Sequence, residues 1–247
     1  MGISSVKLVS FSGIDGAGKS TQIEAFCSHL RDSGLQFSLF TFWDDVVVLA
    51  KWRERASLKA FKGDKGVGSP DCPITRRDKN VTSWYLTGIR LLFYLLDTFR
   101  LCTVVARTAD SGADFIIFDR YIYDELANLP VQHATVRLYI RLLLMFIPKP
   151  DLALLLDADP ESAAARKPEY PLEFVRRNRD AYVRLARLVG MTVIPALPIQ
   201  QAAQVIKDAV SEKCFPAELG TVDMRVQYPL ASSPGASPHP QNLPTTS

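Results

Sequence analysis

The segment Gly13–Ser20, with the sequence Gly-Ile-Asp-Gly-Ala-Gly-Lys-Ser, constrains the fold more than any other part of the chain. It matches the pattern G-x-x-x-x-G-K-S/T at every defined position. An apolar run, Val6–Ser12, precedes it and is typical of a strand, and Lys19–Asp32 follows it with helical spacing. A glycine-rich turn without a ligand has no need of Lys-Ser at this spacing. The segment therefore predicts a phosphate-binding loop (P-loop) between a strand and a helix.

The chemistry of such a loop gives each residue an expected role. Glycines let backbone N–H groups turn toward a phosphate, and the helix N-terminus adds partial positive charge. Lys19 can reach the β- and γ-phosphates, Ser20 can ligate Mg²⁺, and Thr21 can hydrogen-bond the α-phosphate. Asp15, inside the loop, is a further catalytic candidate. The residues expected to bind ATP are Gly13, Asp15, Gly16, Ala17, Gly18, Lys19, Ser20 and Thr21.

The remaining segments alternate between strand and helix patterns. Such an order predicts an α/β protein of three layers, a P-loop NTPase sandwich in which helices flank a parallel sheet of about five strands. We expect Asp44 or Asp45 to cap a helix after the second strand, and a long helix over Val81–Asp110. The expected strands after Val6–Ser12 are Leu35–Phe42, Phe115–Phe118, Leu152–Asp157 and Met191–Ile194.

Composition divides the chain into two parts. With 47% hydrophobic and 22% charged residues, most of the chain has the composition of a globular domain. We expect one P-loop kinase domain over residues 1–214, with a long loop at 62–80. Residues 215–247 are rich in Pro and Ser, so a disordered tail is predicted there.

Charge, hydropathy and cysteine spacing exclude several classes of partner. A net charge of +3 is too small to indicate nucleic-acid binding. The apolar segments Ile89–Ala106 and Val136–Ile147 are too charged or too short to span a membrane. The N-terminus has no basic region typical of a signal peptide, and no cysteine pair has metal-binding spacing. We expect a cytoplasmic protein with reduced thiols.

Asp119 stands where an apolar strand, Phe115–Phe118, ends. Ligands of open α/β sheets bind at the carboxyl ends of the strands, so Asp119 could hold Mg²⁺ directly or through water. An aspartate in this place is explained equally well as a helix cap. The nearby P-loop favours the metal role.

Five cations follow the fourth predicted strand. They are Arg166, Lys167, Arg176, Arg177 and Arg179. Most charge runs are solvated helix faces, but five cations are more than a short lid needs. Mobile cations can stabilise the charge that develops during phosphoryl transfer. We therefore favour Arg166 and Arg177 as catalytic residues on a short lid.

Four segments together resemble the thymidylate kinase family of nucleoside monophosphate kinases, over about residues 6–210. The resemblance implies transfer of the γ-phosphoryl group of ATP to a nucleoside monophosphate, a nucleotide substrate that is a small molecule. It also permits a homodimer, since many members pair through helices flanking the sheet. The segments are Phe11–Gln22, Asp119-Arg120-Tyr121, Pro150–Glu161 and Phe174–Ala186.

The resemblance also implies substrate contacts. Arg120 would contact the acceptor phosphate, with Tyr121 beside it, and Phe93 would stack on the acceptor base. A core aromatic on an apolar helix explains Phe93 nearly as well. Gly16 stands where some members carry a catalytic arginine, and Arg166 and Lys167 match members that carry these cations in the lid.

The chain departs from the family pattern on the acceptor side. It has Phe42-Trp43-Asp44-Asp45 in place of an Arg-Glu-Pro-Gly-Gly stretch, and Asp97 in place of an arginine that binds the acceptor phosphate. Arg100, about one turn further on, could replace one missing cation. Residues 76–80 could supply other cations for the acceptor phosphate.

Three hypotheses therefore stand. The first is a nucleoside monophosphate kinase acting on a thymidylate-like acceptor. The second is a kinase of a neutral hydroxyl acceptor such as a deoxynucleoside, with Asp44 or Asp45 as the base. The third is a nucleotide-binding regulator without turnover, which the intact Lys19, Asp119 and lid cations disfavour.

Overall fold

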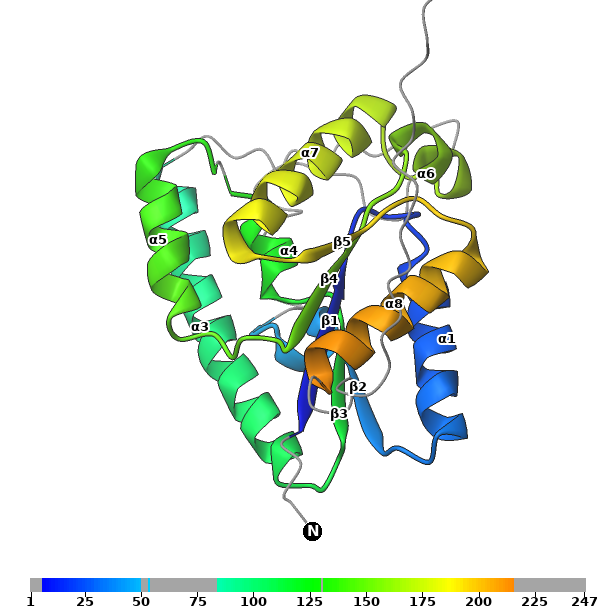
Figure 1. Cartoon of the computed structure of the whole chain (residues 1–247). Helices are drawn as coiled ribbons and strands as arrows, with labels where there is room; N and C mark the ends of the chain where they lie inside the picture. The colour runs from blue at the N-terminus through cyan, green and yellow to red at the C-terminus, as the bar shows by residue number, and fades with distance from the viewer. Residues whose placement is uncertain (1–5, 50–52, 54–83, 130, 216–247) are drawn as a thin grey trace, which may run out of the picture.

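The computed structural model describes residues 6–49, 53, 84–129 and 131–215 (Figure 1). The predicted loop at 62–80, Cys72 and all but the first residue of the predicted tail lie outside these residues. The description below refers to the remainder of the chain.

A single sheet of five parallel strands forms the centre of the molecule. Its strands lie in the order β2-β3-β1-β4-β5, and every neighbouring pair is parallel. The predicted number, direction and approximate bounds of the strands are confirmed. The strands are β1 (Lys7–Ser12), β2 (Phe37–Thr41), β3 (Phe115–Asp119), β4 (Leu152–Leu156) and β5 (Thr192–Ile194).

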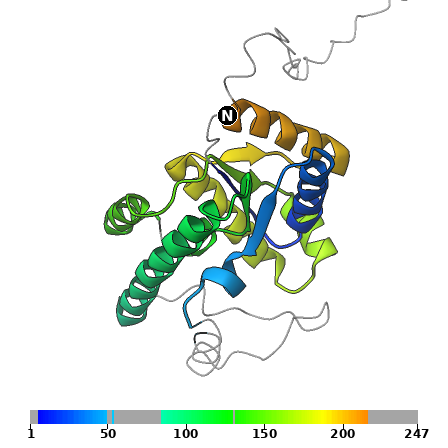
Figure 2. The ribbon, with the colours of Figure 1, turned by 90° about the horizontal axis from the view of Figure 1, so that it is seen from below.

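Helices cover both faces of this sheet, which confirms the three-layer α/β class. In Figures 1 and 2, α1 and α8 lie on one face, whereas α3, α5 and α7 lie on the other. The helices are α1 (Lys19–Asp32), the π-helical turn η1 (Phe42–Val46), α3 (Trp84–Ala109), α4 (Ile122–Leu126), α5 (Ala134–Leu144), α6 (Pro160–Arg166), α7 (Leu172–Val189) and α8 (Ile199–Cys214).

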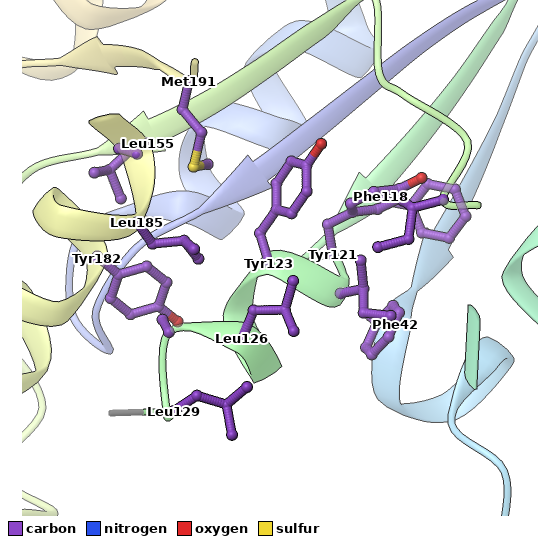
Figure 3. Packing of buried hydrophobic residues seen from close by; sticks show 14 of the residues in the cluster. Phe42, Phe118, Tyr121, Tyr123, Leu126, Leu129, Leu155, Tyr182, Leu185 and Met191 are labelled. Atoms are coloured by element: carbon purple, nitrogen blue, oxygen red, sulfur yellow. The ribbon is translucent and has the colours of Figure 1, made fainter. Parts of the chain in front are cut away.

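Two hydrophobic clusters, one on each face, hold these layers together. Alternate residues of a strand point to opposite faces, so Val9 and Phe11 of β1 pack with α1 and α8, whereas Leu8 packs into the other cluster. The second cluster joins α3, α4, α5 and α7 to the sheet, and Figure 3 shows its centre around Tyr121 and Tyr123. Because both faces are covered, β3 and β4 are apolar almost throughout.

The strand register sets the position of the site. Phe11 near the end of β1 pairs with Asp119 of β3, and Asp119 pairs in turn with Thr41 at the end of β2. The segments after Ser12, Thr41 and Asp119 therefore leave the sheet along one edge. Binding sites of open parallel sheets lie at this edge.

The segment after β2 differs from the sequence expectation. A helix cap at Asp44 or Asp45 is not found: the turn η1 begins at Phe42, and an Asp45 carboxylate oxygen accepts the backbone N–H of Thr41 at 2.7 Å. The sequence also predicts a mostly helical stretch over Tyr123–Phe146 with an interruption at Pro130, and this is confirmed, because α4 ends at Leu126 and α5 begins at Ala134.

The last described residue belongs to the packed structure. Cys214 is buried at the end of α8, and the ring of Phe215 lies 6.0 Å from that of Phe115 in β3. Phe215, the first residue of the predicted tail, thus packs against the sheet.

Candidate functional site

The P-loop takes a shape that only glycine permits at two of its positions. Gly13 and Gly16 have φ angles of 147° and 81°, in the region that residues with a side chain rarely adopt. A Cβ atom on Gly13 would lie 2.6 Å from the carbonyl oxygen of Leu156. One on Gly16 would overlap the carbonyl oxygen of Ala163 in α6. The loop is therefore packed between the end of β4 and α6.

Lys19 lies at the start of α1 and is only 8% exposed. Its ammonium group donates hydrogen bonds to the carbonyl oxygens of Gly13 and Ile14, at 2.8 and 3.0 Å. Burial, followed by repulsion from Arg120, lowers the pKa of Lys19 to about 8. A cation held across the loop in this way is placed to meet the phosphates of a nucleotide.

Asp119 has an acceptor that suits a metal ion or its water. Its Oδ1 atom is buried and has no hydrogen-bond partner in the described part of the chain. Leaving such an acceptor unpaired is costly, so a ligand at this position is expected. Ser20, exposed at the start of α1, is the second expected ligand. Both residues fit Mg²⁺, which one or two protein oxygens and substrate phosphates commonly hold.

Over the described ranges, no group of three or more His, Cys, Asp or Glu side chains could hold a metal ion. Cys27, Cys102 and Cys214 are free thiols. None of the described helices is long and apolar enough to cross a membrane.

Arg120 and Asp15 are brought together by the fold. Arg120 has a left-handed backbone, with φ 66°, and its N–H donates to the carbonyl oxygen of Phe11 at 2.9 Å. Its guanidinium forms an ion pair with Asp15 in the P-loop. Burial alone would lower the pKa of Arg120, but Tyr182, Asp124 and Asp15 together raise it. Arg120 is therefore a permanent cation beside the loop.

Asp124 is a functional candidate that sequence reasoning missed. It is 4% exposed and accepts hydrogen bonds from Ser12 Oγ at 2.6 Å and Tyr182 Oη at 2.7 Å. Arg120 also approaches it, at 3.4 Å. The available signal was its position three residues after Tyr121, because a carboxylate at the third position of a helix can accept the backbone N–H of the N-cap residue.

Tyr121 lies in the core. Its side chain is fully buried, packs against Phe42 and Phe118 and donates a hydrogen bond to the carbonyl oxygen of Pro148 (Figure 3). Its backbone N–H donates to Asp124 at 3.0 Å. A substrate contact through Tyr121 remains a prediction.

The predicted acceptor side contains a second cluster that the sequence did not reveal. Asp97 is fully buried and accepts the Val48 N–H at 2.8 Å and a guanidinium N–H of Arg53 at 2.6 Å. The Arg53 guanidinium lies 5.6 Å from the Trp43 ring centroid and 5.0 Å from that of Phe93. Burial raises the pKa of Asp97, while Val48 and Arg53 oppose that shift. The Phe93 ring thus contacts the Arg53 guanidinium, and its stacking on an acceptor base stays a prediction.

Arg100 and Asp44 lie on the surface near this cluster. Arg100 is exposed and donates from Nε to the backbone carbonyl oxygen of Asp45 at 3.0 Å. Asp44 is exposed within η1. The structure therefore places both candidates along the contact between η1 and α3.

The five lid cations contact the lid itself and the end of β4. Arg166 donates to the carbonyl oxygen of Ser162 at 3.2 Å, and Arg177 pairs with Glu173 at 3.4 Å. Arg179 makes two bonds of 2.6 Å to the Asp157 carboxylate. The remaining pairs are Arg176 with Glu161 and Lys167 with Glu169. The segment predicted as a lid forms α6 and α7, and four of its five cations pair with neighbouring acids, whereas Arg166 bonds to a backbone carbonyl oxygen.

The parallel sheet in the order 2-3-1-4-5 and its glycine loop with a buried lysine define an α/β protein of the P-loop NTPase type. The chain is distantly similar to probable thymidylate kinases over most of its length. It is 22% identical to one from Archaeoglobus fulgidus, over 82% of this chain and 94% of that protein. It is 26% identical to probable thymidylate kinase 1 of Saccharolobus solfataricus, over 81% of this chain and 97% of that protein.

A third relative matches a shorter part of the chain at a higher identity. The chain is 32% identical to a probable thymidylate kinase of Pyrobaculum calidifontis, over 39% of this chain and 52% of that protein. No protein-family model matches the chain. The similarity agrees with a divergent kinase of this kind.

Proposed function

We propose that the chain transfers the γ-phosphoryl group of ATP to a nucleoside monophosphate that resembles thymidylate. The observation that supports this most is the juxtaposition of Lys19 in the P-loop with the ion pair between Asp15 and Arg120. One side of this arrangement suits a triphosphate and the other a second phosphate. The distant similarity to probable thymidylate kinases supports the same reaction.

On the donor side, loop amides would surround the β-phosphate and Lys19 would stabilise charge on the group in transfer. Ser20 and Asp119 would hold Mg²⁺, which neutralises phosphate charge when bound. Transfer leaves ADP and a nucleoside diphosphate.

On the acceptor side, Arg120 would bind the monophosphate. Its present partner is Asp15, so binding of the acceptor would exchange one anion for another. Because the guanidinium stays charged, this exchange needs no proton transfer.

The lid would complete the site. Arg166 and Arg177 are exposed on α6 and α7, with weak pairings that solvent screens. Closure of these helices would bring cations to the transferred group and exclude water, which limits wasteful hydrolysis of ATP.

One observation favours the second candidate, a hydroxyl acceptor such as a deoxynucleoside. Asp97 and Arg53 form a closed ion pair, where related kinases are expected to offer an arginine to the acceptor phosphate. Asp44, exposed nearby, could serve as the base for an attacking hydroxyl. A nucleotide-binding regulator without turnover is the third candidate.

A single assay separates the three. Purified protein with ATP and Mg²⁺ is offered dTMP, other monophosphates and the corresponding nucleosides, and ADP release is followed. We expect turnover with a monophosphate, dTMP foremost. Preference for a nucleoside over its monophosphate would replace the first proposal by the second, and binding of ATP without turnover would support the third.

We also propose that two copies associate through the outer faces of α3 and α5. A hydrogen bond from Tyr139 to Leu91 joins the two helices, and one from Cys102 to Phe146 joins α3 to the turn that follows α5. An exposed apolar surface of this kind commonly marks an interface. Light scattering should give the mass of two chains, and Phe99→Ser should give one. The large exposed apolar residues of α3, α5 and the turn after α5 are Ile89, Leu92, Leu95, Leu96, Phe99, Leu138, Leu142, Met145 and Phe146.

A further inference from the structure

One buried carboxylate links three separate parts of the site. Asp124 on α4 is bonded to Ser12 at the end of β1, to Arg120 beside the P-loop and to Tyr182 on the lid helix α7. Figure 3 shows the Tyr182 ring on α7 facing α4. The loop, the acceptor cation and the lid therefore share one anion.

The geometry divides the donors evenly between the two oxygens of Asp124. Oδ1 accepts from the Tyr182 hydroxyl at 2.7 Å and lies 3.4 Å from Arg120 Nη1. Oδ2 accepts from the Ser12 hydroxyl at 2.6 Å and from the Tyr121 N–H at 3.0 Å. Donors from β1, α7, the Arg120 side chain and the start of α4 therefore meet at one carboxylate.

The residues of this network are shielded from solvent, which makes each hydrogen bond costly to lose. Asp124 and Tyr182 are each 4% exposed and Ser12 is fully buried. In such surroundings a satisfied network is rigid, whereas a donor left unpaired is costly. The Arg120 Nη1 atom also lies 3.4 Å from the Tyr182 hydroxyl, so tyrosine and aspartate together define one side of the guanidinium.

The lid helix is tied to the same edge of the sheet at a second point. Arg179, three residues before Tyr182, makes its two bonds to Asp157 at the end of β4. A rotation or shift of α7 must therefore change the Tyr182 contact with Asp124 and Arg120. An apolar residue at 182 would fill the same space without making this connection.

We propose that Asp124 and Tyr182 are positioning residues. They orient the guanidinium of Arg120 toward the acceptor and couple its orientation to the position of the lid helix α7. The proposal rests on the proposed role of Arg120 in binding the acceptor. Neither residue needs to touch a substrate. Their contribution is to fix the direction of a flexible cation that Asp15 also attracts.

The decisive variant is Tyr182→Phe, which keeps the ring and removes the hydroxyl. We expect the KM for the acceptor to rise roughly tenfold, because one hydrogen bond to a charged group is lost. The KM for ATP should stay within twofold of the wild-type value. The matched control is Tyr123→Phe on α4, whose hydroxyl points away from Tyr182 in Figure 3 and which should leave both constants unchanged. An unchanged acceptor KM in Tyr182→Phe would overturn the proposal.

A second measurement does not depend on turnover. The side-chain N–H signals of Arg120 are followed by NMR on protein labelled with ¹⁵N-arginine and assigned with Arg120→Lys. We expect slowly exchanging signals in the wild type and in Tyr123→Phe, and faster exchange in Tyr182→Phe. If the wild type phosphorylates no monophosphate, the proposed function fails, yet these signals still decide whether Tyr182 holds Arg120. Equal exchange in all three folded proteins would reject the positioning role.

Discussion

Gly16 of the P-loop lies directly against the backbone carbonyl group of Ala163 in α6. A Cβ atom built on Gly16 would overlap that oxygen, and the Gly16 φ angle of 81° already disfavours a side chain. The nucleotide loop and the first helix of the lid are thus in backbone contact. A change in the shape of the loop would therefore act on α6 directly, without an intervening side chain.

We predict that Gly16→Ala abolishes nucleotide binding and lowers the free energy of unfolding by more than about 2 kcal/mol, since strain and overlap add. The matched control is Gly112→Ala. Gly112 has nearly the same φ angle, 82°, but open space around its Cα, so only the left-handed penalty of roughly 1 kcal/mol applies. Urea denaturation and calorimetry with ATP measure both effects. Equal losses of stability in the two variants would show that the contact with Ala163 is unimportant.

The sequence predicts correctly those features that a few consecutive residues specify. The glycine loop, the five strands and the aspartate that ends β3 are each specified by a few consecutive residues, and the structure has all of them. Asp124 and Tyr182 are 58 residues apart, and Arg53 and Asp97 are 44 apart. No short pattern marks such pairs, because the fold alone brings their elements together.

The position of Tyr121 shows a second limit. Its neighbours Asp119 and Arg120 lie at the site edge, whereas the left-handed backbone of Arg120 turns the chain and the Tyr121 side chain enters the core. The substrate contact of Tyr121 stays a prediction, but its burial was not expected from the motif. A positive φ angle at an arginine is not readable from the sequence.

We predict that Lys19→Met lowers turnover by at least roughly a thousandfold, because it removes the charge that meets the transferred phosphoryl group. The same change should leave stability unchanged or raise it, since a buried ammonium is costly and methionine has a similar shape. ADP release and thermal unfolding report the two effects. The control is Lys149→Met, which removes an exposed lysine. Full activity of a folded Lys19→Met protein would exclude this role for the lysine.

We predict that ATP binding takes up a proton at alkaline pH. The pKa of Lys19 is lowered to about 8 by burial first, and a bound polyphosphate favours the charged form. Affinity should therefore fall as pH rises through 8, and calorimetry at pH 8.5 in buffers of different ionisation enthalpy should detect proton uptake. Lys19→Met should show none. Uptake of equal size in Lys19→Met would assign the proton to another group.

The same shift in pKa has the opposite consequence for folding. Between about pH 8 and the ordinary lysine value of 10.5, the unfolded chain binds more protons at Lys19 than the folded chain does. Stability from this group therefore rises with pH across that window, and its cost is fully present below pH 8. Binding and stability should thus respond to pH with opposite signs.

We predict that Asp119→Asn lowers turnover by roughly a hundredfold and raises the Mg²⁺ concentration needed for half-maximal activity, because a charged metal ligand is lost. Stability should not fall, since Asp119 Oδ1 has no hydrogen-bond partner in the described ranges to lose. Magnesium titration and thermal unfolding measure these changes. Asp32→Asn, on the exposed end of α1, is the control. A wild-type Mg²⁺ requirement in Asp119→Asn would remove this residue from the metal site.

We predict that a chain ending at Phe215 keeps the activity and stability of the full chain. A chain ending at Glu212 should lose about 2 kcal/mol or more, because it lacks two residues that bury apolar surface. Cys214 is 2% exposed within the cluster formed with α1, and Phe215 packs on Phe115. Urea denaturation of both truncated chains, with ADP release as a check on the site, measures the difference. Equal midpoints for the two truncated chains would mean that the end of α8 contributes nothing to the fold.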